Sequence, residues 1–127
     1  MPYALQDPHP RLLSFVASLT SLVNRKADEA TTLQEGRELL QTLVQHDDWL
    51  PLVQAQPDPQ RYQQYLLYAD PQDRFSVVSF VWGPGQSTPI HNHTVWGLVG
   101  MMRGSEGCQA YAPDAQGRYV PSGPVLM

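Results

Sequence analysis

The sequence predicts a single domain over residues 1–127, with a helical region over about residues 1–50 and a mainly β region over about residues 61–127. A length of 127 residues suits one domain and leaves little room for two. Eight of the nine glycines follow residue 82, and closely spaced glycines are typical of turns between short strands. The apolar pattern agrees, because spacings of three and four dominate before residue 50, whereas β-branched and aromatic runs follow residue 60.

Two helices are expected in the N-terminal region. The first is predicted over about residues 9–25 and the second over about residues 29–46, with Asp28 or Thr31 as the cap of the second. Each helix places its apolar residues along one stripe, which predicts that both bury one face. The stripes consist of Leu12, Phe15, Val16, Leu19, Leu22 and Val23 in the first helix, and of Leu33, Leu39, Leu40, Leu43 and Val44 in the second.

The C-terminal region contains three segments with strand character and one hairpin. Residues 62–68 fit a strand or a helix, and their aromatic content and flanking prolines favour a strand. Residues 75–82 and 95–102 are rich in β-branched and apolar residues, and both are predicted to be strands. A hairpin is predicted from residues 107–112 and 118–120, across a turn that ends in glycine.

The composition excludes several classes of function. Eight Lys and Arg against twelve Asp and Glu give a net charge of -4, so the chain lacks the cationic surplus that nucleic-acid binding requires. The sequence shows no run that could span a bilayer and no signal-peptide pattern. The single cysteine, Cys108, cannot form an internal disulfide and is expected to be a half-buried strand residue. These features predict a cytoplasmic protein that binds neither nucleic acid nor membrane.

The most informative segment contains two histidines, His91 and His93, separated by one residue. On a strand, residues two apart point to the same face, so both rings could bind one metal ion. Neutral imidazole suits iron, zinc, copper or nickel better than magnesium or calcium. A pair of solvent-facing or hydrogen-bonded histidines explains the bare pattern equally well.

Glycines on both sides of His91 and His93 add a second pattern to the histidine pair. The spacing of Gly85, His91, His93, Gly97 and Gly104 resembles the first conserved motif of the cupin family. The resemblance implies a double-stranded β-helix, or jelly-roll, barrel. In this motif the family usually has a glutamate ligand where this sequence has Gly97, so the carboxylate of a two-histidine-one-carboxylate site is absent.

A longer stretch, residues 62–106, resembles a cupin branch without that carboxylate, the thiol dioxygenases. The similarity is strongest in residues 75–85, 88–97 and 101–104, the second of which reads Thr-Pro-Ile-His-Asn-His-Thr-Val-Trp-Gly. The resemblance implies Fe(II) held by three histidines, of which His91 and His93 are the first two. It also implies addition of O2 to a small thiol, 3-mercaptopropionate or L-cysteine, to give a sulfinate. The family usually has aspartate where this chain has asparagine between the histidines.

The resemblance also suggests two substrate-binding residues. It places Gln64 where cysteine-specific members have an arginine that binds the substrate carboxylate, and glutamine there is typical of the 3-mercaptopropionate branch. Glutamine donates hydrogen bonds but lacks the charge and the fork of arginine. The alternative is that Gln64 is an ordinary surface residue. Tyr62 is a second candidate for the pocket wall, and Cys108 lies too far along the chain to match the cysteine that some members cross-link to tyrosine.

The third histidine of the family has no counterpart here, because no histidine follows His93. The family's second motif would lie beyond Met127, so we expect a cupin barrel that is incomplete at the C-terminus and weak or no turnover. Exposed strand edges then predict a homo-oligomer. The alternative function is a non-catalytic cupin binding module. A zinc or manganese cupin isomerase is a further alternative, which the lack of a carboxylate at Gly97 disfavours.

Overall fold

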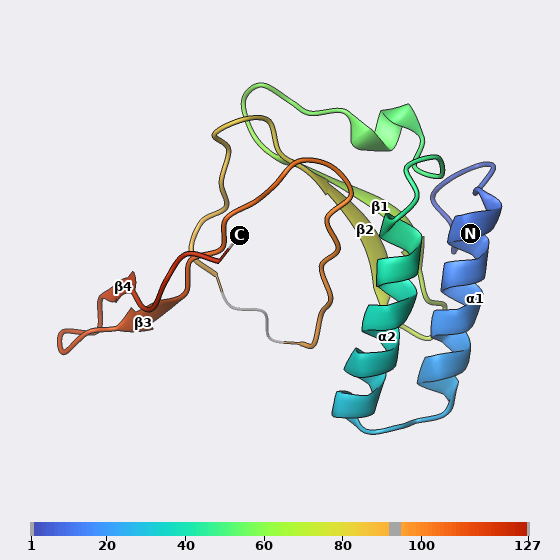
Figure 1. Cartoon of the computed structure of the whole chain (residues 1–127), viewed down its shortest axis with the longest axis horizontal. Coiled ribbons are helices and arrows are strands. Elements are labelled where there is room, and N and C mark those ends of the chain that lie inside the picture. The colour runs from blue at the N-terminus through green and yellow to red at the C-terminus, as the bar shows by residue number, and fades with distance from the viewer. Residues whose placement is uncertain (1, 92–94, 127) are drawn as a thin grey trace.

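A computed structural model describes residues 2–91 and 95–126 (Figure 1). The two helices lie side by side to the right of a two-stranded sheet in this view, and a small hairpin projects to the left. Together these elements make a mixed α/β domain. Their bounds in chain order are α1 Pro10–Asn24, α2 Glu29–Val44, the 3-10 helix η1 Leu52–Ala55, β1 Gln63–Ala69, β2 Ser76–Val81, β3 Tyr111–Pro113 and β4 Tyr119–Pro121.

Both predicted helices are confirmed, within one or two residues at each end. Nδ1 of His9 accepts the backbone N–H of Arg11 at 3.0 Å, which caps the start of α1. The Asp28 carboxylate accepts the backbone N–H of Thr31 at 2.8 Å, so Asp28 rather than Thr31 caps α2. This hydrogen bond is the main cause that lowers the pKa of Asp28 below its ordinary value. Among the residues described, no helix is long and apolar enough to cross a membrane.

The core lies between α1, the end of α2 and β1. Leu12 and Leu67 are its most deeply buried large side chains, with 0% and 1% of their surface exposed. Burial of such a side chain contributes about 1.5–3 kcal/mol. Trp49 closes the core behind α2, where its indole N–H donates to the carbonyl oxygen of Leu43 at 3.1 Å. The full buried cluster is Leu5, Leu12, Phe15, Val16, Leu19, Leu22, Leu43, Trp49, Leu67 and Tyr68.

β1 and β2 form an antiparallel hairpin, which confirms the strands predicted over residues 62–68 and 75–82. The register shifts between Leu66 and Tyr68, so Leu67 is an extra residue that turns into the core. In the connecting turn, the Arg74 Nε donates to the buried Asp70 carboxylate at 2.8 Å. Another guanidinium nitrogen of Arg74 donates to Asn24 at the end of α1. The turn therefore holds the sheet against the helices, and the Arg74 hydrogen bond lowers the pKa of Asp70.

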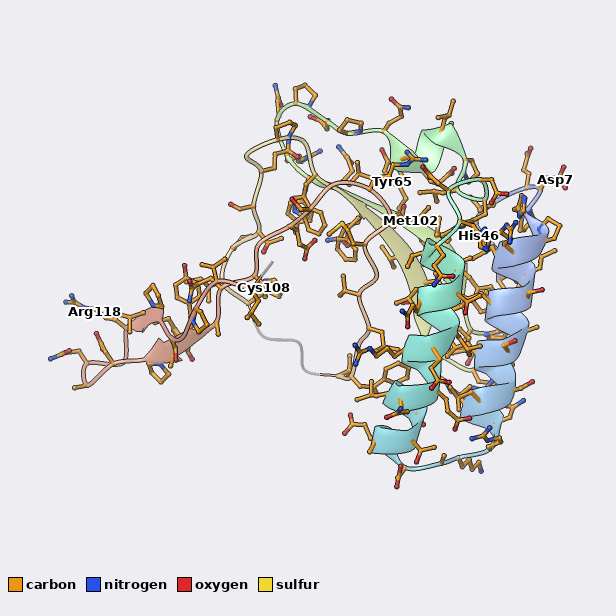
Figure 2. The ribbon with its side chains drawn as sticks, in the orientation of Figure 1. Asp7, His46, Tyr65, Met102, Cys108 and Arg118 are labelled. Atoms are coloured by element: carbon orange, nitrogen blue, oxygen red, sulfur yellow. The ribbon has the colours of Figure 1, made fainter. Side chains whose placement is uncertain are left out.

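The second predicted hairpin is also confirmed, although its strands are shorter than expected. β3 and β4 pair antiparallel, with Ala112 opposite Val120. Gly117 has a φ of 80° in the connecting turn, a conformation that favours glycine. Figure 2 shows Arg118 on this projecting hairpin. Cys108 lies before it, where its backbone forms a bridge to Leu126, and is exposed rather than half-buried.

The strand predicted over residues 95–102 is wrong, because this segment pairs with no strand among the described residues. It lies along α2 instead: a Cβ on Gly100 would be 2.8 Å from Val44 Cγ1. The Arg103 guanidinium then binds the Asp47 carboxylate just after α2, with Nε 2.8 Å from Oδ1. A helix surface thus takes the place of a neighbouring strand. As a result the described residues are not mainly β, and they form no closed barrel.

Candidate functional site

The β1–β2 sheet has two unlike faces. One packs on the core and on η1, where the Tyr65 hydroxyl donates to Gln56 O at 2.7 Å and the Ser79 hydroxyl donates to Gln54 O at 2.8 Å. Directly opposite residues of an antiparallel pair share a face, so Gln64 and Phe80 lie together on the other one. We call this second surface the open face of the sheet. It consists of Tyr62, Gln64, Leu66, Val78, Phe80 and Trp82.

Aromatic stacking organises the open face. The ring of Trp82 stacks on Tyr62, with centroids 5.8 Å apart, and on Phe80, with centroids 5.6 Å apart. Gln64 lies opposite Phe80 and two residues after Tyr62 in the chain, and its side chain is exposed. The structure therefore brings both predicted substrate residues, Tyr62 and Gln64, to one uncharged and largely apolar surface. Leu66 and Phe80 are 48% and 47% exposed there, which is unusual for large apolar residues on one sheet face.

A turn connects this face to the part of the chain that contains His91 and His93, which we call the histidine segment. β2 ends at Val81, and Gly85 adopts a φ of 77°, a conformation that favours glycine, in the turn that follows. The amide of Gln86 spans the turn: its Oε1 accepts the Gly83 N–H at 2.6 Å, and its Nε2 donates to the Asp58 carbonyl oxygen. Gln86 thus fixes the exit from β2 against the loop before β1. The sequence pattern did not reveal this role, because a glutamine in a turn matches no motif.

His91 lies five residues beyond Gln86. The segment over residues 83–91 extends to the left of the sheet in Figure 1. Its ring is exposed, and Nδ1 lies 2.8 Å from the carbonyl oxygen of Pro89. A carbonyl oxygen can only accept, so Nδ1 carries the proton in this hydrogen bond. In the neutral ring the lone pair is then on Nε2. A backbone carbonyl on one ring nitrogen is the usual way to orient a histidine that ligates metal through the other.

The second predicted ligand, His93, lies outside the described residues, as does Asn92. Over residues 2–91 and 95–126, no group of three or more His, Cys, Asp or Glu side chains is placed to hold a metal ion. Of the two predicted ligands, His91 is the one whose ring orientation the structure gives. That orientation suits coordination through Nε2.

Comparison of the sequence with models of known protein families finds no match. The resemblance to the thiol dioxygenases rests on the sequence of residues 62–106, chiefly residues 75–85, 88–97 and 101–104. The remaining two histidines, His9 and His46, lie on the opposite part of the molecule, where both line a groove between α1 and α2. His9 caps α1, and no sequence signal predicted that its ring shares a groove with His46, because 36 residues separate them.

Proposed function

We propose that this chain carries the iron-binding and thiol-binding part of a cupin-type thiol dioxygenase, with His91 and His93 as Fe(II) ligands. The observation that supports it best is the hydrogen bond from His91 Nδ1 to the Pro89 carbonyl, because a histidine that ligates a metal through one ring nitrogen usually donates the other N–H to such a group. Bound ferrous iron would supply activation of O2 and of the substrate thiol, giving a sulfinate. Imidazole ligands suit this role, because they leave the full charge of the ion to stabilise a thiolate.

The open face supports a small carboxylated thiol as substrate. Gln64 would donate its amide N–H groups to the carboxylate, and the stacked rings of Tyr62 and Trp82 would exclude water from the apolar part of the substrate. An amide hydrogen-bonds a carboxylate without the charge or bidentate geometry of arginine. Since the six residues of the open face are uncharged, 3-mercaptopropionate, which has no ammonium group to satisfy, fits better than L-cysteine.

The oligomer stays a prediction, and exposed apolar side chains support it. Val95 and Val99 are 77% and 72% exposed in the segment along α2, and Leu126 is 64% exposed near the end of the chain. Such residues favour burial against another surface. Light scattering on the purified chain should give a mass above that of one copy, and a compact monomer would count against the oligomer.

The function is tested by loading the chain with Fe(II) without oxygen, adding 3-mercaptopropionate and O2, and quantifying the sulfinate by NMR. We expect slow product formation that is lost in His91→Gln and kept in His46→Gln, whose histidine lies at the helix groove. A second readout covers very slow turnover: the thiol should strengthen Fe(II) binding by the parent chain, since both would share one site. Equal product from His91→Gln contradicts the proposal. Absence of product and of thiol-linked binding supports a non-catalytic module instead.

A further inference from the structure

A groove separates the start of α1 from the end of α2, on the helical part of the molecule. Its volume is about 600 Å³, within the range of small-molecule sites. Phe15 and Leu43, two buried core residues, contribute to its floor together with Leu39. Figure 2 shows His46 at the end of α2 that lies beside the start of α1. The described lining residues all precede residue 50, so this groove is separate from the open face and from the histidine segment.

Polar groups at the rim of this groove are mainly hydrogen-bond donors. The Arg11 guanidinium uses Nε to bind the Asp48 carboxylate, at 3.0 Å and 3.3 Å from its two oxygens. Within the described part of the chain, the two terminal nitrogens of Arg11 make no hydrogen bond, and four N–H groups remain for a ligand. Nδ1 of His9 accepts a backbone N–H, so the proton of its neutral ring is on Nε2, which is a further donor.

The terminal nitrogens of Arg11 donate and cannot accept, which favours an anionic ligand beside them. The planar guanidinium of Arg11 matches the geometry of a carboxylate and can bind both of its oxygens. The hydroxyls of Ser14 and Ser18, one and two turns along α1, extend the polar wall. Asp48 opposes an anion, but its carboxylate is bound at Nε of Arg11, so the edge formed by the two terminal nitrogens remains for a second carboxylate. Because the floor is apolar, the ligand should carry an apolar body beside its acidic group.

We infer that this groove binds a small carboxylic acid with a short apolar tail, held by Arg11 and His9 at the carboxylate and by Phe15 and Leu39 along the tail. The site is independent of the proposed iron centre, because it shares no residue with it. We infer binding alone, without a second catalytic activity in the groove. The bound acid has about the size of a six-carbon chain.

The inference is tested on the full chain by titrating hexanoate into the isotopically labelled protein and following amide chemical shifts. We expect saturable shifts in residues 9–18 and 39–48, with a dissociation constant on the order of 1 mM. Hexan-1-ol, which has the same tail and no charge, should bind at least about tenfold more weakly, as expected when a charge-assisted hydrogen bond is lost. Equal shifts from the alcohol, or no saturable shifts from hexanoate, would overturn the inference.

Three variants separate the anion contact from general effects. Arg11→Gln should weaken hexanoate binding about tenfold, and Asp48→Asn should strengthen it, because it removes the opposing charge and keeps an oxygen for Arg11 Nε. Arg25→Gln is the matched control, since Arg25 forms a comparable ion pair with Glu35 outside the groove. If Arg11→Gln does not fold, Asp48→Asn and the alcohol comparison still decide. Weaker binding by Asp48→Asn, or equal losses in Arg11→Gln and Arg25→Gln, would contradict the site.

Discussion

Residues 95–102 pack along α2, and this packing predicts opposite effects for an alanine at Gly97 and at Gly100. A Cβ on Gly100 would lie 2.8 Å from Val44 Cγ1, 3.0 Å from Leu40 Cγ and 3.2 Å from Leu40 Cδ2. A Cβ on Gly97 would have no atom within 4 Å. Neither glycine has the positive φ that would strain an alanine. The two substitutions therefore differ in contact with α2 and not in backbone conformation.

Gly100→Ala should destabilise the fold by about 1–3 kcal/mol, the usual cost of forcing a carbon into a packed site. Part of this cost is offset, since alanine lowers the conformational entropy of the unfolded chain and thereby stabilises by about 0.4–1 kcal/mol. Gly97→Ala should show only this gain. The free energy of unfolding, from urea titrations followed by far-UV circular dichroism, measures both. Equal effects of the two alanines would refute the placement of residues 95–102 along α2.

Three further predictions concern the core and the turn that supports the sheet. Leu12→Ala should reduce the free energy of unfolding by about 2–5 kcal/mol, because the residue is fully buried, and urea unfolding checks it. Trp49→Phe should cost about 1–3 kcal/mol in the same assay, since it removes the hydrogen bond to Leu43 and leaves a gap. The lowered pKa of Asp70 means that its ionised form stabilises the fold above its unfolded pKa, and this contribution is lost as the pH falls below about 4. Asp70→Asn should thus be less stable than the parent at pH 7, and the difference should shrink in acid; a constant difference would rule out a role for Asp70 ionisation.

Local signals predicted the N-terminal half well. The apolar stripe of α1 became the centre of the core, and Asp28 ended as a cap because its carboxylate can reach the N–H three residues on. β1 and β2 were also predictable, since a short turn joins two runs of β-forming residues. The bulge at Leu67 was not, because the strand alternates regularly up to that point and only packing on the helices turns the extra residue inward.

The features that the sequence could not predict depend on contacts between residues that are far apart in the chain. Residues 95–102 consist of apolar residues and glycine, and a helix surface with room for Gly100 suits this composition as well as a neighbouring strand does. For the candidate site, the sequence predicted Tyr62, Gln64, His91 and His93, and these stay predictions. The pairing of Gln64 with Phe80 could not be predicted, because it depends on strand register. The position of the Gln86 amide depends on contacts with residues nearly thirty positions away. Such contacts leave no trace in local periodicity.

The central claim is that His91 binds Fe(II) through Nε2, with its ring oriented by the Pro89 carbonyl. Fe(II) dissociation constants, measured by equilibrium dialysis without oxygen on the parent chain and on His91→Gln, His93→Gln and His46→Gln, test it most directly. Loss of either His91 or His93 should weaken Fe(II) binding by more than about tenfold, because even a group that only supports a ligand contributes about that much. The His46 variant should bind as the parent does. Unchanged Fe(II) affinity in His91→Gln would contradict Fe(II) binding by His91.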